Sequence, residues 1–322
     1  MAWRAILTVN RPAVKPRTVS GGSGDHKTNG YNPVMNTPPP QAVPGKTAAP
    51  AGVQRIGCVG YLNAKPLIEG LEGLADPVVS LDVPSALMSD LECGGVDIAL
   101  CPVIDYYRSK RPLVIVPVGC IASDGPTLTV RLFSRVPVDS IARVHADTGS
   151  HTSVALLRVL LNELHGARPG VVAFDARGDG ASEQLTDAPQ AMLLIGDKVV
   201  NNAPSARDYP HQLDLGEAWK RLTGLPFVFA IWMAHRDTDL GDLPKRLDRQ
   251  REHNAKQIEA IAQRHAASHG WEVPQACDYL SRVLSYRVEE DHLQAMQRFA
   301  GYAAGLGLIR NPRALERWRA RD

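Results

Sequence analysis

The sequence predicts an α/β protein with two lobes and a C-terminal helical segment. Three observations favour this fold class. Apolar runs typical of buried strands alternate with helical patterns, the alternation comes in two successive blocks, and after residue 237 only helical patterns follow. Strands that are separated by helices form β-α-β units, which build largely parallel sheets.

The first block begins at Val53 and contains five strand-like runs. The predicted strands cover residues 55–60, 77–83, 96–103, 112–122 and 127–134, and the predicted helices cover residues 65–73 and 84–92. Gly73 suits the end of the first helix, because glycine adopts the left-handed conformation that commonly follows a helix.

The second block has the same alternating character, and a helical tail follows it. The predicted strands cover residues 142–147, 170–175, 191–197 and 226–233, and the predicted helices cover residues 152–165 and 216–222. In the tail we expect one long helix over residues 244–269, with Pro244 in its first turn and Gly270 after its end, and further helices near 275–285 and 290–304. The sequence contains no evident internal repeat.

Two α/β blocks favour a division into two lobes that the chain crosses and re-crosses. We predict that residues 53–133 and 227–322 form the first lobe and residues 134–226 the second, with the crossings near 127–134 and 226–233. In such folds a ligand binds between the lobes, outside the C-terminal ends of the strands.

Residues 1–52 differ from the rest of the chain. They contain eight of the 24 prolines, several glycines and the run Pro38–Pro40. Six basic residues and one acidic residue give this segment a net charge of +5. Because such a segment buries too little apolar surface to offset its ordering entropy, we predict a disordered extension, part of which need not be translated.

Composition and charge exclude several classes of protein. The 322 residues are 44% hydrophobic and 22% charged, and no apolar run approaches the ~20 residues that span a bilayer. The net charge is +2, so the part after residue 52 carries −3, which disfavours nucleic acid as a partner. The five cysteines form no C-x-x-C pair, which fits a reducing compartment, and we expect a cytoplasmic protein.

The chain lacks the common cofactor and nucleophile motifs, including the glycine-rich nucleotide loops, H-E-x-x-H and G-x-S-x-G. His265 and His269 are four residues apart on the predicted long helix and could ligate a metal ion. Two cationic side chains near a helix C-terminus explain the same spacing, because the helix dipole favours them. We therefore predict no metal and no cofactor.

Small polar residues follow the predicted strands instead. Asn63 follows the first strand, Ser85 follows the second, and Ser150, Thr152 and Ser153 begin the helix after the first strand of the second block. Hydroxyl groups and the N–H groups of a helix N-terminus bind carboxylates and phosphates. Plain helix capping and turn formation explain each residue taken singly, but their recurrence at strand ends favours an anion site.

Other polar residues are weaker candidates for the ligand site. The segment Ser123–Pro126 suits a turn, and Thr129 lies in a predicted crossing strand, where its hydroxyl could face the ligand or solvent. His151 could act as a general base, although a histidine beside a helix start is more often structural. Asp197 and Asp214 suit helix starts and caps.

Several motifs follow one another in a specific order over residues 55–233. They are R-I-G-C-V-G-Y-L-N-A-K-P-L, V-P-S-A-L, G-V-D-I-A-L-C-P-V-I-D-Y, I-A-S-D-G-P, L-F-S-R-V-P, H-T-S-V-A-L-L-R, L-L-I-G-D and D-L-G-E-A-W-K-R-L-T-G-L-P-F-V-F-A-I-W. This ordered set resembles the chorismate dehydratase family of the futalosine route to menaquinone, and the helical tail resembles the family more loosely.

The resemblance implies a periplasmic-binding-protein-like fold of type II, with two crossover strands. It also implies a hydro-lyase that converts chorismate, a small dicarboxylate, into 3-[(1-carboxyvinyl)oxy]benzoate without a cofactor. Asn63 matches the family's active-site asparagine, and Thr129 stands where the family usually has a serine after G-P-x-x. Ser85 belongs to one of the matching motifs, and Ser150, Thr152 and Ser153 match the polar turn that would hold a substrate carboxylate.

Two other functions remain open. A non-enzymatic solute-binding protein of the same fold would bind a small anion, but it would carry a signal peptide or a lipid-modified cysteine, and the sequence shows neither. The sister enzyme that makes dihydroxynaphthoate shares the fold, but it resembles this chain less at the first strand-to-helix turn. No side chain is an evident catalytic base, so we expect a carboxylate of the substrate to serve. The sequence does not indicate the oligomeric state.

Overall fold

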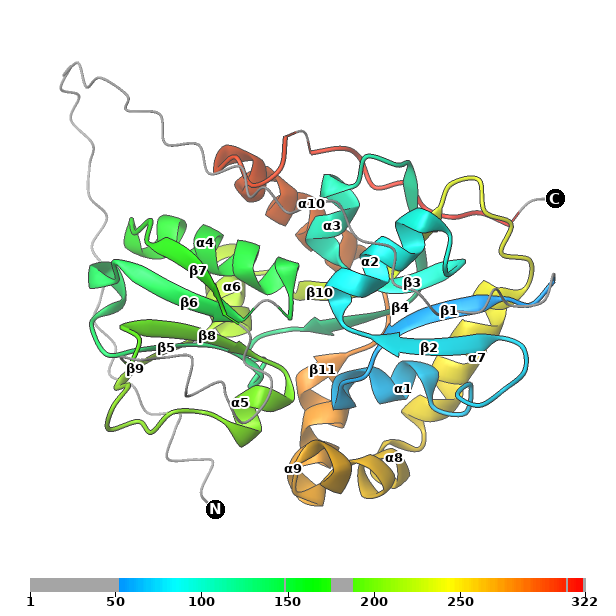
Figure 1. The fold of residues 1–322 in the computed structure, drawn as a ribbon, viewed down its shortest axis with the longest axis horizontal. Helices are drawn as coiled ribbons and strands as arrows, with labels where there is room; N and C mark the ends of the chain where they lie inside the picture. Colours follow the sequence, from blue (N-terminus) through cyan, green and yellow to red (C-terminus); the bar gives the residue numbers. More distant parts are fainter. Residues whose placement is uncertain (1–51, 148, 175–187, 311, 321–322) are drawn as a thin grey trace. The chain divides into compact units, whose positions relative to one another are not determined.

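Two β-sheets organise the part of the chain that the computed structural model describes, which comprises residues 52–147, 149–174, 188–310 and 312–320. These residues belong to one compact unit. The predicted extension over residues 1–52 lies outside the described residues, except for Gly52. Figure 1 shows the two sheets and their helices.

The first sheet has six strands in the order β11-β4-β10-β3-β1-β2. They are β1 (Arg55–Val59), β2 (Val78–Asp82), β3 (Ile98–Pro102), β4 (Leu113–Ser123), β10 (Phe227–His235) and β11 (Leu284–Ser285). β1 pairs in parallel with β2 and β3, whereas β10 lies antiparallel between β3 and β4.

The second sheet has five strands in the order β7-β6-β8-β5-β9. They are β5 (Val130–Ser134), β6 (Arg143–Asp147), β7 (Gly170–Phe174), β8 (Ala191–Ile195) and β9 (His211–Asp214). β6 pairs in parallel with β7 and β8, and β5 lies antiparallel between β8 and β9. The two sheets therefore share one strand order, although the sequence shows no repeat.

The chain crosses between the sheets at the two predicted places. It leaves the first sheet at Ser123, enters the second at Val130, and returns through α6 (Leu215–Thr223) into β10. We predicted that residues 127–133 belong to the first lobe. β5 instead pairs within the second sheet, so the sheet boundary lies just before Val130 rather than after residue 133.

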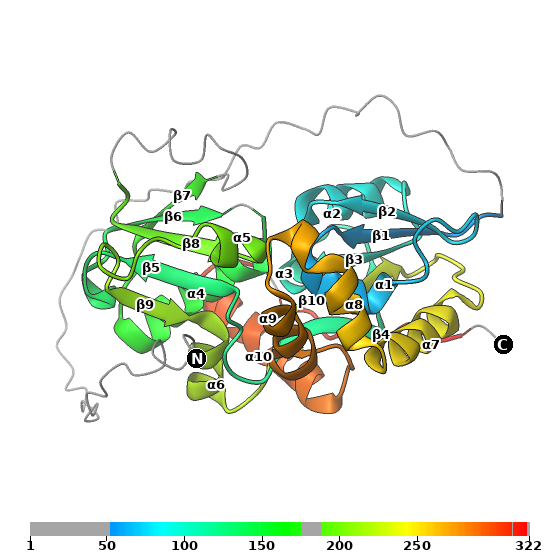
Figure 2. The same cartoon turned by 90° about the horizontal axis from the view of Figure 1, so that it is seen from below.

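Helices follow most strands, as the alternating pattern predicts. The remaining helices are η2 (Leu62–Ala64), α1 (Lys65–Ile68), α2 (Pro84–Cys93), α3 (Val103–Arg108), η3 (Val138–Ser140), α4 (His151–His165), α5 (Asp197–Asn201), α7 (Leu243–Ala255), α8 (Ile258–His265), η4 (Ala267–His269), α9 (Val273–Asp278), the π-helical turn η5 (Tyr279–Val283) and α10 (Glu290–Gly305). Figure 2 shows α8 beside α9, and contacts confirm that they pack together.

The tail differs from the prediction. The single helix expected over residues 244–269 is wrong, because the chain forms α7, α8 and η4 in succession. The predicted helix near 275–285 ends as the π-helical turn and then as the short strand β11, although we expected no strand there. The first predicted helix is also shorter, since α1 ends at Ile68.

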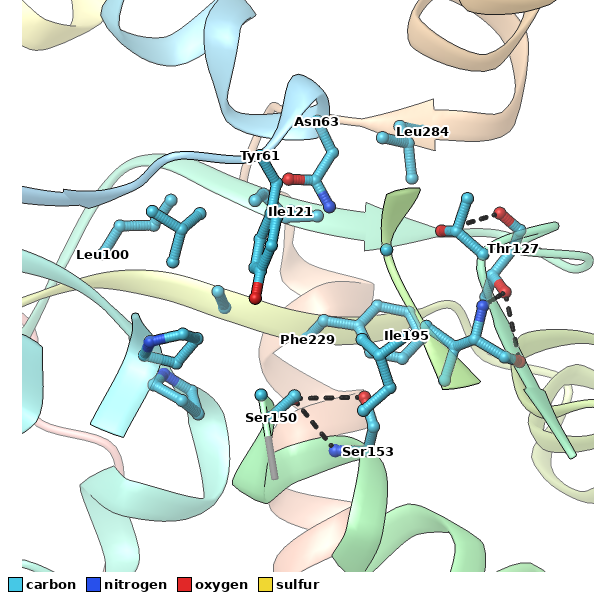
Figure 3. A pocket seen from close by; sticks show the side chains of 18 of the residues that line it. Tyr61, Asn63, Leu100, Ile121, Thr127, Ser150, Ser153, Ile195, Phe229 and Leu284 are labelled. Atoms are coloured by element: carbon cyan, nitrogen blue, oxygen red, sulfur yellow. Dashed lines mark hydrogen bonds between the residues drawn. The ribbon is translucent and has the colours of Figure 1, made fainter. Parts of the chain in front are cut away.

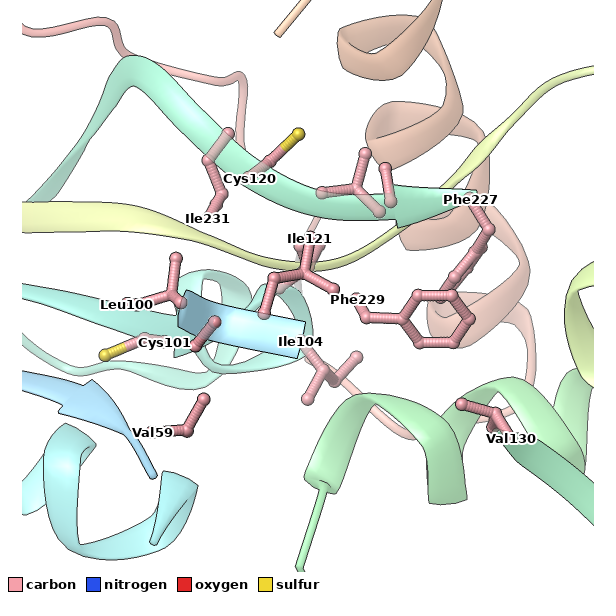
Figure 4. Packing of buried hydrophobic residues seen from close by; sticks show 14 of the residues in the cluster. Val59, Leu100, Cys101, Ile104, Cys120, Ile121, Val130, Phe227, Phe229 and Ile231 are labelled. Carbon is pink, nitrogen blue, oxygen red and sulfur yellow. The ribbon is translucent and has the colours of Figure 1, made fainter. Parts of the chain in front are cut away.

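One apolar cluster includes buried residues of both sheets. Cys58, Cys101 and Cys120 are fully buried in it, as their strand-like surroundings predict. Figure 4 shows Leu100, Ile121 and Phe229 packed in this cluster.

Among the described residues, no helix combines the length and the apolar character that a membrane span requires.

Candidate functional site

A pocket lies between residues of the two sheets. It is open to solvent on one side. Both sheets and the C-terminal segment line it: Val59, Tyr61, Asn63, Pro84, Leu100, Pro102, Ile121, Thr127, Thr129, Val130, Gly149, Ser150, Ser153, Ile195, Gly196, Phe229, Ala230, Tyr279 and Leu284. A lining that is mostly apolar, with a few converging polar groups, is typical of sites that bind small molecules.

The apolar floor of the pocket belongs to the core of the protein. Val59, Leu100, Ile121 and Phe229 line the pocket and are also buried members of the main apolar cluster. Since these side chains are fixed by close packing, the polar groups around them are held on a rigid support.

Asn63 extends into the pocket from η2, the turn that follows β1. α1 follows directly, with Pro66 in its first turn, and Tyr61 and Asn63 both line the pocket (Figure 3). The Oδ1 atom of Asn63 is buried and has no hydrogen-bond partner among the described residues. A ligand with a hydroxyl or N–H group could donate a hydrogen bond to this buried, unpartnered oxygen.

Thr129 lies on the first crossing and is buried. Its Oγ1 atom is 2.8 Å from the hydroxyl oxygen of Tyr279 and 3.4 Å from the carbonyl oxygen of Thr127. The predicted strand over residues 127–129 is wrong, because β5 begins only at Val130 and Thr129 belongs to the turn before it.

Asp214 holds this crossing turn in place. Its carboxylate accepts hydrogen bonds from the N–H groups of Thr127 and Leu128, at 2.9 Å each, and it also caps α6 through Gly216 and Glu217. Leu128 has a φ of 62°, which a leucine adopts only where its surroundings enforce it. The helix cap that we predicted for Asp214 therefore also positions the pocket residues beside it.

Ser150 and Ser153 line the opposite side of the pocket at the start of α4 (Figure 3). Ser150 is the N-cap residue, and its Oγ atom accepts hydrogen bonds from the backbone N–H of Ser153 at 3.3 Å and from the Ser153 hydroxyl at 3.1 Å. The capping interpretation of Ser150 is thus confirmed, and the residue also lines the pocket, whereas its contact with a ligand stays a prediction.

Thr152 is not among the pocket-lining residues. Thr152 is fully buried, and its Oγ1 atom accepts a hydrogen bond from the N–H of Ile104 at 3.2 Å. It therefore joins α4 to the start of α3. Ser85 lies in the first turn of α2, after Pro84, and the N-cap that we predicted for it is Val83; its side chain lies outside what the structure describes.

His151 is also turned away from the pocket lining. Its Nδ1 atom is 2.8 Å from Oδ2 of Asp105, and this hydrogen bond raises the pKa of the imidazole. The pair joins the start of α4 to α3, beside the Thr152 contact. These two neighbouring residues of α4 therefore connect the two halves of the protein rather than line the pocket.

Tyr279 is a pocket residue that our sequence prediction missed. It is fully buried, and burial raises the pKa of its phenol far above the ordinary value. Its ring stacks on Trp271 with centroids 4.7 Å apart, and the indole Nε1 of Trp271 donates to Asp197 at 2.9 Å. The only signal in the sequence was a pair of aromatic residues within the helical tail.

Asp197 connects three parts of the chain near the pocket. It begins α5 directly after Gly196, and its carboxylate also faces the N–H of Leu62 at 3.4 Å. Burial raises the pKa of this carboxyl group. The neighbouring Lys198 is neutralised by Asp147, whose Oδ2 lies 2.7 Å from its Nζ atom.

The pocket lining contains no charged side chain among the described residues. Its polar groups are hydroxyls, one amide and backbone, and the N-termini of α2 and α4 lie at its edge through Pro84 and Ser150. Helix N-termini carry a partial positive charge, so the site suits an anion that is held by hydrogen bonds.

The candidate metal ligands of the sequence are engaged elsewhere. Nε2 of His265 is 2.7 Å from a carboxylate oxygen of Glu69, and Nδ1 of His269 is 2.8 Å from the carbonyl of His265. Among the described residues, Glu289, Asp291 and His292 group closely, and hydrogen bonds there form the capping box of α10.

Comparisons with known proteins agree with this fold and this resemblance. A chorismate dehydratase from Thermus thermophilus is 33% identical over 198 residues, which are 56% of this chain and 70% of that protein. An alkanesulfonate-binding protein from Xanthomonas axonopodis pv. citri, solved with bound MOPS, has a TM-score of 0.63 at 15% identity, covering 85% of this chain and 100% of that chain. A periplasmic aliphatic sulphonate-binding protein from Escherichia coli has a TM-score of 0.57 at 16% identity, covering 84% and 93%.

The solved structures confirm the predicted periplasmic-binding-protein-like fold, and at these identities they show the fold alone. A model of the menaquinone biosynthesis family matches residues 54–305, which include both sheets and α10. Because this match covers most of the sequence, the chain belongs to the menaquinone biosynthesis family.

Proposed function

We propose that this protein is a carbon–oxygen lyase that removes water from chorismate and gives 3-[(1-carboxyvinyl)oxy]benzoate in the futalosine route to menaquinone. The chorismate dehydratase relative, at 33% identity, supports this substrate. We place the reaction in the cytoplasm, where buried unpaired thiols such as Cys58, Cys101 and Cys120 stay reduced.

The observation that carries the proposal is the convergence of four predicted residues on one cavity. Asn63, Thr129, Ser150 and Ser153 come from both sheets and line the same pocket. Chorismate carries two carboxylates, a ring hydroxyl and an apolar ring edge. Hydroxyl donors and the helix N-terminus at Ser150 suit a carboxylate, while Leu100, Ile121 and Phe229 suit the ring.

The reaction needs no electron acceptor. The bond between hydrogen and the ring carbon that bears the enolpyruvyl ether breaks, its electron pair forms a ring double bond, and the neighbouring carbon–oxygen bond breaks. The departing hydroxide takes up a proton and leaves as water. Because the ring becomes aromatic, the protein mainly has to fix geometry and stabilise the charge that develops on the leaving oxygen.

The described residues that line the pocket offer no side chain that could act as the catalytic base. No Asp, Glu or His is among the described residues that line it. We propose that a carboxylate of the substrate removes the ring proton. In this scheme Ser150 and Ser153 orient that carboxylate, and Asn63 contacts the reacting end of the ring.

Incubation of the purified protein with chorismate tests the proposal. We expect a product that is lighter than chorismate by one water and retains the enolpyruvyl group, detected by liquid chromatography and mass spectrometry. The Thr129→Val variant, which removes one donor from the pocket, should form it roughly 100-fold more slowly. Unchanged chorismate after incubation with the wild type would refute the proposal.

The second candidate is a non-enzymatic binding protein for a small anion. The structural likeness to two sulfonate-binding proteins supports it, since a sulfonate is an anion of similar size to a carboxylate. This function predicts saturable binding of chorismate or a sulfonate, measured by calorimetry, with no product formed. Formation of a naphthoate product from a different substrate would instead indicate the sister activity.

A further inference from the structure

We propose that Tyr279 is a positioning residue that sets the direction of a hydrogen-bond chain running from Tyr279 through Thr129 to the substrate. The chain leaves the Thr129 hydroxyl free to donate to the substrate hydroxyl that departs. This inference rests on the proposed dehydration and adds a residue from the helical tail to its machinery.

The first link is the Tyr279 hydroxyl itself. Tyr279 is buried, and Thr129 is the hydrogen-bond partner of its hydroxyl among the described residues. A buried O–H group without an acceptor is costly, so this proton needs Thr129 as its acceptor.

The second link joins Tyr279 to Thr129. The two hydroxyl oxygens are 2.8 Å apart, and either could donate. Thr129 Oγ1 can also donate to the carbonyl oxygen of Thr127, whereas the Tyr279 O–H has no other acceptor among the described residues, so Tyr279 donates and Thr129 accepts. Burial raises the pKa of Tyr279, so the phenol keeps this proton at neutral pH.

The third link is left open for the substrate. Once Thr129 accepts from Tyr279, its own proton can go to one acceptor among the described residues, the carbonyl oxygen of Thr127. The two oxygen atoms are 3.4 Å apart, which is long for a hydrogen bond. Thr129 lines the pocket, so a ligand hydroxyl could take this proton in a shorter bond. A donor aimed at the departing oxygen stabilises the negative charge that develops there.

The Tyr279 ring is held so that its hydroxyl cannot turn away. It stacks on Trp271 at an interplanar angle of 17°, and Trp271 is in turn anchored by its hydrogen bond to Asp197. Tyr279 also begins the π-helical turn η5, a rare conformation that is frequent at functional sites. The tail thus supplies a rigid support for the chain.

A double-mutant cycle in the full-length protein tests the inference. Thr129→Val and Tyr279→Phe should each lower kcat for chorismate, by about 100-fold and at least about tenfold respectively, with little change in KM. The double variant should be no slower than Thr129→Val alone, because both changes interrupt one chain. Tyr107→Phe is the matched control, since its buried hydroxyl donates to Met296 at 3.1 Å, away from the pocket, and its kcat should stay at the wild-type value.

The outcomes separate this inference from the proposed function. A Tyr279→Phe variant with wild-type kcat, or losses that multiply in the double variant, would overturn the role of Tyr279 while leaving the dehydration intact. A loss that appears only in KM or in the melting temperature would also overturn it, because it would show a structural role. Absence of chorismate turnover by the wild type would overturn both proposals.

Discussion

The buried amide of Asn63 is the residue at which stability and the proposed function oppose each other. An unsatisfied buried acceptor costs about 1–3 kcal/mol, and Oδ1 of Asn63 has no hydrogen-bond partner among the described residues. Hydrogen bonding to a substrate would recover this energy. We therefore propose that this position favours ligand binding at a cost in stability.

We predict that Asn63→Leu leaves the melting temperature unchanged or raises it, while it lowers kcat/KM for chorismate by about 100-fold. The substitution removes the unpartnered acceptor and, in our proposal, a contact with the reacting end of the substrate. Asn254→Leu is the control, because the Asn254 amide is buried and donates to the carbonyl of Glu69 at 2.9 Å. That variant should unfold more easily, by about 1–3 kcal/mol, and keep its kcat. Equal losses of stability in the two variants would contradict this account of Asn63.

At the scale of single elements, the first crossing depends on a close approach to α6. A Cβ atom built on Gly216 would clash with the carbonyl oxygen of Gly125 and with Cγ2 of Thr127. Asp214, at the cap of the same helix, binds the N–H groups of Thr127 and Leu128. The start of α6 therefore places Thr129 in the pocket.

We predict that Gly216→Ala destabilises the protein by about 1–3 kcal/mol and also lowers turnover, because the crossing turn has to move. Chemical denaturation and the chorismate assay measure the two effects. Gly301→Ala is the matched control, since a Cβ atom added to this residue of α10 would enter open space and alanine favours a helix. Wild-type stability of Gly216→Ala would show that the close approach is unimportant.

The sequence predicted the strands in apolar runs better than the polar strand and the shortest helices. β1, β3, β6, β8 and β10 lie where apolar runs predict strands. The strand β9 was missed because its four residues, His211–Asp214, are mostly polar and lie at a sheet edge. The helices α3 and α5 were missed because five or six residues carry too little periodicity.

Tertiary contacts decided the features that the pattern could not reveal. The helical pattern over residues 244–269 contains no glycine or proline at its break, yet α7 ends at Ala255. There the amides of Gln250 and Asn254 both donate to the carbonyl of Glu69, which ties the end of α7 to α1.

Thr152 and Ser153 are adjacent in sequence, and only their positions on α4 direct one towards α3 and the other towards the pocket.

At the scale of the whole molecule, α3 and α4 connect the halves that carry the two sheets. His151 pairs with Asp105, and Thr152 accepts from Ile104, so two adjacent residues of α4 hold adjacent residues of α3. Ser150, the residue before them, lines the pocket. Any change in these contacts would therefore alter the distance across the ligand site.

We predict that the contribution of His151 to stability falls as pH rises. The hydrogen bond with Asp105 raises the pKa of His151 above its ordinary value of 6.5, so the contribution is complete below pH 6.5 and is lost as pH rises through the folded-state pKa. Melting curves of wild type and His151→Asn should differ most at acidic pH and converge at alkaline pH. Asp105→Asn should show the same trend, and a gap that grows with pH would contradict it.

The claim on which the rest depends is that the cavity between the sheets holds the aromatic product of the dehydration. A crystal structure of the protein after incubation with chorismate tests it most directly. We expect 3-[(1-carboxyvinyl)oxy]benzoate in this cavity, with one carboxylate at the Ser150 and Ser153 hydroxyls and the ring within reach of Asn63 and Thr129. Product bound at another surface, or intact chorismate in the cavity, would contradict the account.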